Sequence, residues 1–85
     1  MTVQVRYWAA ARAAAGSELE EYAGAATLAD LLAAITERHA GGGLPAVLAR
    51  CSYLVDEVSP GTRDPAQVQL AEAALVEVLP PFAGG

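Results

Sequence analysis

The chain begins with hydrophobic and polar residues in alternation, the two-residue period of a β-strand that is buried on one face. Across residues 3–8, one face carries Val3, Val5 and Tyr7, and the other carries Gln4, Arg6 and Trp8. Residues 17–23 show a weaker strand pattern, in which Leu19 is the clearest inward position. The acidic residues of this segment predict a solvated edge, with contact to a basic partner surface as the alternative; they are Glu18, Glu20 and Glu21.

A helical pattern follows each of these two strands. The alanine-rich segment 9–15 has a high helix propensity, and we expect Gly16 to end it. The main helix is predicted to begin after Thr27, a good N-cap residue, because apolar residues then recur at helical spacing. Those residues are Leu28, Leu31, Leu32 and Ile35. The glycine run 41–43 ends this helix, with His39 in its last turn.

The second half of the chain predicts two further strands. The expected elements are a helical turn at 44–48, a third strand at 50–55, an irregular segment at 62–74 and a last strand at 75–79. Val68 and Leu70 are the candidate core anchors of the irregular segment. One main helix that crosses one small mixed sheet is the economical way to bury both apolar stripes, so we expect one α+β domain over residues 1–79.

One face of this sheet is predicted to lack a covering helix. If Val76 and Val78 face the main helix, the other residues of the last strand share the opposite face with those of the first strand. We expect a docking face there, because contiguous exposed apolar surface usually marks an interface. Its predicted members are Arg6, Trp8, Leu75, Glu77 and Leu79. The alternative is that the loop 61–74 covers Trp8.

Composition and charge exclude several classes of partner. The formal net charge is −5 and no basic run is present, which argues against nucleic acid and anionic membranes as partners. No apolar run approaches transmembrane length, and the first residues do not follow the pattern of a signal peptide, so we expect a cytoplasmic protein. All five cationic residues are arginine, so the chain offers no lysine for modification.

Residue types that usually carry catalysis or bind metals are scarce. One histidine, one cysteine and no lysine leave no metal-ligand cluster, and no glycine-rich phosphate loop follows a strand. We interpret His39 as a capping or surface residue, and Cys51 as a small core residue rather than a sulfur relay. The chain is therefore expected to have no active site, metal or bound cofactor of its own.

The printed sequence ends with Pro80, Pro81, Phe82, Ala83, Gly84 and Gly85. The prolines favour an extended segment, and the glycines, which lack a Cβ, can enter a narrow channel. We expect residues 80–85 to form an extended, mobile tail that carries a free carboxylate into another enzyme's active site. Phe82 is predicted to anchor this tail in the partner's channel, with folding back onto the open sheet face as the alternative.

Three segments resemble the small subunit of molybdopterin synthase, the MoaD family of ubiquitin-like sulfur carriers. The ending 75–85 is the sharpest match, with a hydrophobic strand, a Pro-Pro pair and a terminal Gly-Gly. Residues 5–16 are similar to the family's opening strand, aromatic pair and arginine-containing short helix, and residues 27–32 to the start of its main helix. The resemblance implies a ubiquitin-like β-grasp fold, with a mixed sheet of about four to five strands crossed by one main helix.

Two turns depart from the family's pattern. Residues 71–74, Ala-Glu-Ala-Ala, stand where the family often has Gly-Asp before the last strand. The dipeptide 56–57, Asp-Glu, stands where it often has a turn like Asn-Gly. These departures leave the geometry of both turns open but do not affect the chemistry of the tail.

The resemblance also implies a chemistry that begins at the α-carboxyl of Gly85. In the family, a MoeB-type adenylating enzyme uses ATP to form a glycyl-adenylate, and sulfur from a donor protein then replaces one oxygen to give a thiocarboxylate. The large synthase subunit, of MoaE type, takes in the tail, and the thiocarboxylate sulfurates cyclic pyranopterin monophosphate in molybdenum cofactor biosynthesis. The chain itself would be a non-catalytic sulfur-donor subunit of this enzyme complex.

Three other functions stay open at this point. A sulfur carrier for thiamin thiazole or cysteine synthesis has the same fold, although ThiS-like chains tend to be shorter and to lack the insert at 9–15 and the Pro-Pro pair. A ubiquitin-like modifier, joined through Gly85 to lysines of target proteins, is a rival of a different class. The third is a plain interaction module with an inert, frayed tail.

Overall fold

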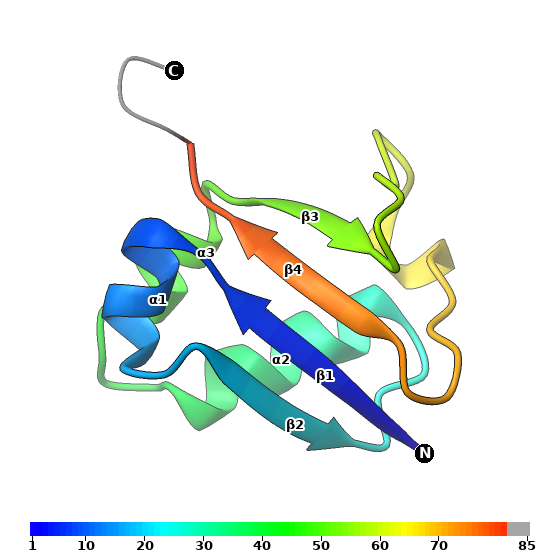
Figure 1. Cartoon of the computed structure of the whole chain (residues 1–85), viewed down its shortest axis with the longest axis horizontal. Helices are drawn as coiled ribbons and strands as arrows, with labels where there is room; N and C mark the ends of the chain where they lie inside the picture. Colours follow the sequence, from blue (N-terminus) through cyan, green and yellow to red (C-terminus); the bar gives the residue numbers. More distant parts are fainter. Residues whose placement is uncertain (82–85) are drawn as a thin grey trace.

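The computed structural model describes residues 1–81, and its strands form one sheet in the order β2–β1–β4–β3 (Figure 1). The strands are β1 (Thr2–Tyr7), β2 (Leu19–Ala23), β3 (Ser52–Val55) and β4 (Leu75–Leu79). β1 and β4 run parallel in the centre of the sheet, and each has an antiparallel neighbour on its outer side. The mixed sheet and the pairing of the first and last strands are therefore confirmed.

The three α-helices of residues 1–81 lie where the sequence predicts them, and a short 3-10 helix forms within the segment 62–74, which was predicted to be irregular. The α-helices are α1 (Ala9–Ala15), α2 (Leu28–Arg38) and α3 (Leu44–Leu48), and the 3-10 helix is η1 (Pro65–Gln67). Gly16 ends α1 in the left-handed conformation, with φ of 73°. At the start of α2, the Thr27 hydroxyl accepts a hydrogen bond from the amide of Asp30 at 3.1 Å, which confirms the predicted N-cap.

The hydrophobic core lies between the helices and the rear face of the sheet as it is viewed in Figure 1. Its completely buried members include Val3 and Val5 from β1, Val76 and Val78 from β4, and Leu31 and Ile35 from α2. The predicted anchors of the irregular segment, Val68 and Leu70, are each 4% exposed, so they also belong to the core. The sheet thus buries one face only.

The face of β2 that packs on the core is the one that the sequence analysis predicted to face solvent. Leu19, predicted to point inward, is 43% exposed, whereas Tyr22 is buried and the Glu20 side chain is only 13% exposed. Because side chains alternate along a strand, a buried Tyr22 places Glu20 on the core side and Leu19 on the other. The prediction of an inward Leu19 and a solvated Glu20 is therefore wrong, and hydrogen bonds described below explain how a carboxylate is accommodated there.

Both turns that depart from the family's pattern adopt left-handed backbone without glycine. Asp56 and Glu57 have φ of 49° and 70°, and the residues that flank them exchange backbone hydrogen bonds of 2.9 and 3.0 Å. This is a two-residue hairpin turn of the type that requires positive φ at both central positions. Ala73, before β4, has φ of 63°, and its amide donates to the Thr2 carbonyl at 2.8 Å.

β4 leads directly into the proline pair. The strand ends at Leu79, Pro80 is buried and Pro81 is exposed, so the packed structure continues one residue past the strand. The predicted tail residues Phe82, Ala83, Gly84 and Gly85 lie outside the described residues, and so does the predicted anchoring role of Phe82. None of the helices in residues 1–81 is long and apolar enough to cross a membrane.

Candidate functional site

The face of the sheet opposite the helices is left uncovered by residues 1–81 and is turned toward the viewer in Figure 1. We call it the open face. The strand registers and the alternation of side chains assign to it Gln4 and Arg6 of β1, Leu19 and Glu21 of β2, Ser52 and Leu54 of β3, and Leu75, Glu77 and Leu79 of β4. Trp8, just beyond β1, is 42% exposed, so the loop 61–74 does not bury it.

Trp8 is held at one end of the open face by two hydrogen bonds to β4. Its backbone amide donates to the Val78 carbonyl at 3.1 Å, and its indole Nε1 donates to Glu77 Oε1 at 3.1 Å. Ala9, the next residue, has φ of 49°, which turns the chain sharply from the end of β1 into α1. The indole is thus a fixed feature of this surface despite its exposure.

The structure brings the predicted face residues together. Arg6 lies opposite Glu77 and Gln4 lies opposite Leu75 in the parallel pair of β1 and β4. The registers also form a row that crosses all four strands, in the order Leu19, Arg6, Glu77 and Leu54. Sequence reasoning missed the two leucines at the ends of this row; for Leu19 the available signal was Tyr22, an aromatic residue three positions away and therefore on the opposite face.

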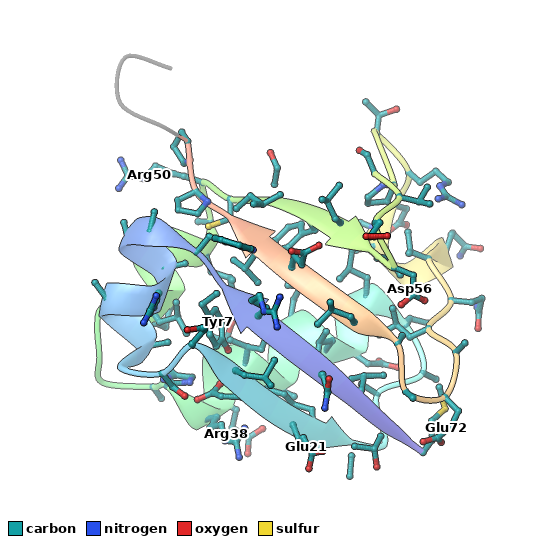
Figure 2. The ribbon with its side chains drawn as sticks, viewed as in Figure 1. Tyr7, Glu21, Arg38, Arg50, Asp56 and Glu72 are labelled. Atoms are coloured by element: carbon teal, nitrogen blue, oxygen red, sulfur yellow. The ribbon has the colours of Figure 1, made fainter. Side chains whose placement is uncertain are left out.

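The open face is continuous with the root of the C-terminal segment. Leu79 lies on this face and immediately precedes Pro80 and Pro81. Ser52 pairs with Leu79, and the exposed Arg50 lies next to the end of β4 (Figure 2). A partner that covers the open face would therefore also meet the point where the chain leaves the sheet.

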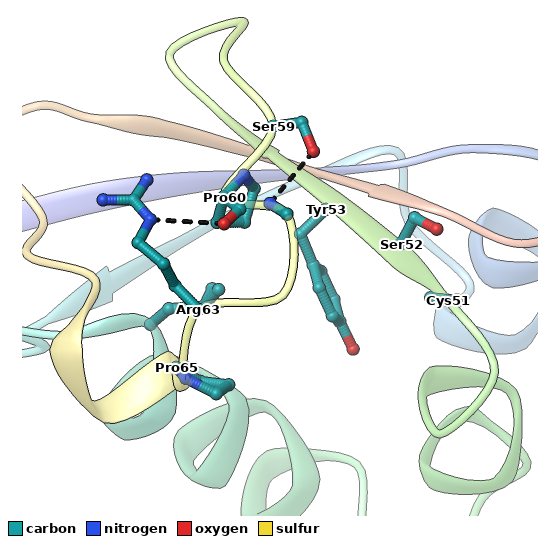
Figure 3. A pocket seen from close by; sticks show the side chains of 9 residues that line it. Cys51, Ser52, Tyr53, Ser59, Pro60, Arg63 and Pro65 are labelled. Atoms are coloured by element: carbon teal, nitrogen blue, oxygen red, sulfur yellow. Dashed lines mark hydrogen bonds between the residues drawn. The ribbon is translucent and has the colours of Figure 1, made fainter.

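A separate hollow of about 400 Å³ lies between β3 and the loop 59–65 (Figure 3). Cys51 is at its edge, and its thiol donates to the Val47 carbonyl at 3.2 Å. Burial raises the pKa of the Cys51 thiol, and burial raises the pKa of Tyr53, which also lines the hollow, to about 12. Both groups stay protonated near neutral pH, so neither is an activated nucleophile, and packing of Cys51 against the core agrees with its sequence-based interpretation.

A polar cluster lies on the core side of β2, around the Glu20 carboxylate. Glu20 Oε1 accepts hydrogen bonds from the hydroxyls of Tyr7 at 2.7 Å and Tyr22 at 2.9 Å. His39 Nε2 lies 3.0 Å from both carboxylate oxygens, and Arg38 Nη1 lies 3.8 Å from Oε1. His39 also caps α2 through its backbone, as predicted, but its ring is part of this cluster rather than of the free surface.

The cluster sets the protonation state of its members. Burial alone raises the pKa of the Glu20 carboxyl, but the hydrogen bonds from His39, Tyr7 and Tyr22 outweigh it and hold that pKa below its ordinary value. Burial raises the pKa of Tyr7, which therefore stays a hydrogen-bond donor. The cluster faces α2 and not the open face, so its role is to join elements. Among residues 1–81, no group of three His, Cys, Asp or Glu side chains is placed to hold a metal ion.

Three solved structures with the same fold give the chain its context. Small archaeal modifier protein 1 from Methanosarcina acetivorans superposes with a TM-score of 0.82 at 20% identity, over 99% of this chain and 96% of that chain. A putative molybdopterin converting factor subunit 1 from Pyrococcus furiosus gives 0.79 at 24% identity, over 96% and 99%. The complex of subunits 1 and 2 of the molybdopterin-converting factor from Helicobacter pylori 26695 gives 0.71 at 25% identity, over 100% of both chains.

These neighbours confirm the ubiquitin-like β-grasp fold that the resemblance implied. Among curated protein sequences, none is significantly similar to this chain. Residues 5–85, however, match the sequence profile of the ThiS family, and this match includes the second half of β1, the whole of β2, β3 and β4, and the Gly-Gly ending. The chain therefore belongs to the ThiS family, and it has the fold shared by MoaD-type sulfur carriers and small ubiquitin-like modifiers.

Proposed function

We propose that this chain is the sulfur carrier subunit of a molybdopterin synthase, activated at the α-carboxyl of Gly85. The family match extends to residue 85, and two of the structural neighbours are subunits of molybdopterin-converting factors. Within the family, the helical insert α1 and the Pro80-Pro81 pair favour this pathway over thiamin thiazole or cysteine synthesis. We place the reaction in the cytoplasm, where ATP is available.

One observation carries the proposal: a single strand joins the open face to the C-terminal segment. Leu75, Glu77 and Leu79 lie on the open face, and the next residues of the chain are Pro80 and Pro81. A partner bound to this face is therefore positioned to receive the last residues in its own active site. Buried area and fixed side chains on the sheet would supply affinity, while the terminal residues supply the reacting group.

The proposed chemistry needs no catalytic residue from this chain. A carboxylate is a poor electrophile, so an adenylating partner of MoeB type first joins the Gly85 carboxyl to AMP, with pyrophosphate as the product from ATP. A sulfur nucleophile then displaces AMP: sulfide gives the thiocarboxylate directly, whereas a persulfide of a donor protein gives an acyl disulfide, which a second thiol cleaves to release the thiocarboxylate and form a new disulfide. The thiocarboxylate sulfur attacks cyclic pyranopterin monophosphate in the large subunit, which supplies the pocket and the acid and base groups.

We propose that the open face docks on the large synthase subunit, of MoaE type. The Helicobacter pylori relative is a complex of subunit 1 with subunit 2, and the surface that our structure leaves uncovered adjoins the segment that must enter a partner. The adenylating enzyme must receive the same terminal residues, so we propose that it uses the same face. In that case the two partners bind one at a time.

The test is the intact mass of the chain after incubation with ATP, a MoeB-type adenylating enzyme and a sulfur source. The expected result is a gain equal to the replacement of one oxygen by sulfur. A variant without Gly85 should show no gain, although its fold is intact, because its new terminal residue lies one position short of the reacting atoms. Addition of the large subunit and cyclic pyranopterin monophosphate should then yield the dithiolene product, and no gain with an active partner enzyme would contradict the proposal.

A ubiquitin-like modifier is the second candidate. It is favoured by the similarity to small archaeal modifier protein 1 from Methanosarcina acetivorans, which superposes with a TM-score of 0.82. In this case the activated Gly85 carboxyl would form an amide bond with lysines of other proteins. Conjugates of higher mass in cells, absent when Gly85 is deleted, would favour the modifier function. A thiocarboxylate formed in the mass assay, without such conjugates in cells, would favour the sulfur carrier.

A further inference from the structure

The middle of the open face contains a buried hydrogen-bond donor without an acceptor. Arg6 Nε is sealed from solvent, and no acceptor within residues 1–81 bonds to it. An N–H group that is buried in this way loses its water and gains nothing in return, which makes such groups rare in folded proteins. Arg6 is in the central strand β1, on the open face, so its guanidinium has no partner among residues 1–81 at the place where a docking protein would lie.

The nearest carboxylate by register has one of its two oxygens engaged elsewhere. Glu77 lies directly opposite Arg6 on β4, where cross-strand neighbours of opposite charge normally pair. Its Oε1 atom instead accepts the indole hydrogen bond of Trp8 at 3.1 Å. Within the described part of the chain, Arg6 forms no ion pair; the basic groups that lie within 4 Å of a carboxylate oxygen are the N-terminus, Arg12, Arg38 and His39.

The surroundings of Arg6 suit a strong interaction with a carboxylate. Leu19 lies opposite Arg6 on β2 and is 43% exposed. The exposed Trp8 follows the end of β1, the strand that contains Arg6. A partner that covers these apolar groups excludes water, and the attraction between opposite charges then becomes stronger. The Arg6 side chain as a whole is only partly buried, and of its guanidinium nitrogens only Nε is sealed, so the two terminal nitrogens can meet a carboxylate with two parallel hydrogen bonds.

We propose that Arg6 is the specificity-determining residue of the open face, and that it binds the side-chain carboxylate of an aspartate or glutamate of the docking partner. This inference rests on the proposed function, in which the open face docks on the large synthase subunit. The chain carries a net charge of −5, so most of its surface repels an acidic group. One free guanidinium amid apolar side chains therefore selects a partner whose carboxylate is placed at this point of the interface.

The test compares Arg6→Met with a matched control. Methionine keeps much of the length of the side chain but removes the charge and the donors. Titration calorimetry with the large synthase subunit from the same organism should show the Kd of Arg6→Met raised by at least about tenfold. Arg63→Met removes a charge from an exposed loop residue that donates only to the Pro60 carbonyl, and its Kd should stay within about twofold of that of the unaltered chain.

A second variant separates the charge of Arg6 from its paired donors. With Arg6→Lys the charge is kept but the two parallel donors are lost, so the Kd should lie between those of the unaltered chain and Arg6→Met. If Arg6→Lys binds as tightly as the unaltered chain, the guanidinium does not form paired hydrogen bonds with a carboxylate and the inference is wrong. Equal or tighter binding by Arg6→Met, with its thermal unfolding unchanged, would also overturn it. Failure of the unaltered chain to bind the large subunit would overturn the proposed function, a distinguishable result.

Discussion

Ala73 carries the clearest backbone strain next to the strand that leads to the C-terminal segment. Its φ of 63° brings its Cβ close to backbone oxygen, and this conformation costs a non-glycine residue roughly 1–2 kcal/mol. The position is nevertheless fixed, because the Ala73 amide donates to the Thr2 carbonyl at 2.8 Å and Ala74 is buried. The start of β4 is thus tied to the start of β1 at the expense of local conformational energy.

The substitution Ala73→Gly should therefore stabilise the protein. Relief of the strain outweighs the greater freedom of glycine in the unfolded chain, and the expected net gain in the free energy of unfolding is about 0.5–1 kcal/mol. Urea unfolding followed by circular dichroism measures it. The matched control is Ala33→Gly, an exposed position inside α2, which should lose about 1 kcal/mol. A loss of stability in both variants would show that Ala73 is not strained.

At the scale of elements, Glu20 joins β1, β2 and α2. Tyr7 comes from β1, Tyr22 from β2, and His39 from the end of α2, and all three bond to one carboxylate. Arg38 adds a contact with its guanidinium carbon 4.5 Å from the centre of the Tyr22 ring. The cluster fixes the angle at which the main helix ends against the sheet, in a region where the edge strand β2 has only one neighbouring strand.

The stability of the fold should depend on the ionisation of Glu20. Because the pKa of this carboxyl lies below its ordinary value of 4.5 in the folded protein, the ionised form stabilises the fold at pH values above 4.5. This contribution is lost as the pH falls through the lowered folded-state pKa. The substitution Glu20→Gln should lower the free energy of unfolding at pH 7 by about 1.5–3 kcal/mol and weaken its dependence on acid.

The control for this experiment is the neighbouring Glu21→Gln. Glu21 is exposed on the open side of β2, so its substitution should change the free energy of unfolding by less than about 0.5 kcal/mol. Denaturant titrations over about four pH units, from about pH 7 down to about pH 3, measure both variants. Equal acid sensitivity of Glu20→Gln and the unaltered protein would mean that the cluster does not stabilise the ionised carboxylate.

Most elements were predictable because their signals are local. The stripe of α2, the stop at Gly16 and the strand 75–79 each depend on neighbouring residues, and the structure confirms them. The orientation of β2 was not predictable in this way. Its core-side carboxylate is accommodated by Tyr7 and His39, which lie 13 and 19 residues away along the chain. The alternation of side chains along β1 and β4 was enough to predict five members of the open face. Leu19 was missed because the orientation of β2 was predicted wrongly.

At the scale of the whole molecule, the helices cover one face of the sheet, and the open face carries the exposed indole of Trp8. Trp8 is 42% exposed, so its truncation should cost little stability. If the open face docks on a partner, Trp8→Ala should raise the Kd for the large synthase subunit by about tenfold to a hundredfold, because buried aromatic anchors dominate interfaces. The control is Val58→Ala in the turn after β3, where the side chain is 63% exposed and outside the open face.

Titration calorimetry gives the Kd of both variants, and urea unfolding gives their free energies of unfolding. Together they decide whether Trp8 serves docking or only the fold. Weaker binding by Trp8→Ala with a nearly unchanged free energy of unfolding supports docking through this face. A loss of stability without weaker binding would mean that the indole belongs to the fold alone, through its hydrogen bond to Glu77. Equal effects of Trp8→Ala and Val58→Ala on the Kd would argue against a specific contact between Trp8 and the partner.

The central position of β4 also has a mechanical consequence. If, as proposed, a partner holds the sheet and draws the C-terminal residues into a channel, the tension would act along the axis of β4. Hydrogen bonds lie across that axis on both sides, to β1 and to β3, so they would be loaded together in shear rather than opened one after another. An edge strand would peel away under the same force. The central place of β4 therefore favours a sheet that resists a pull on the end of this strand.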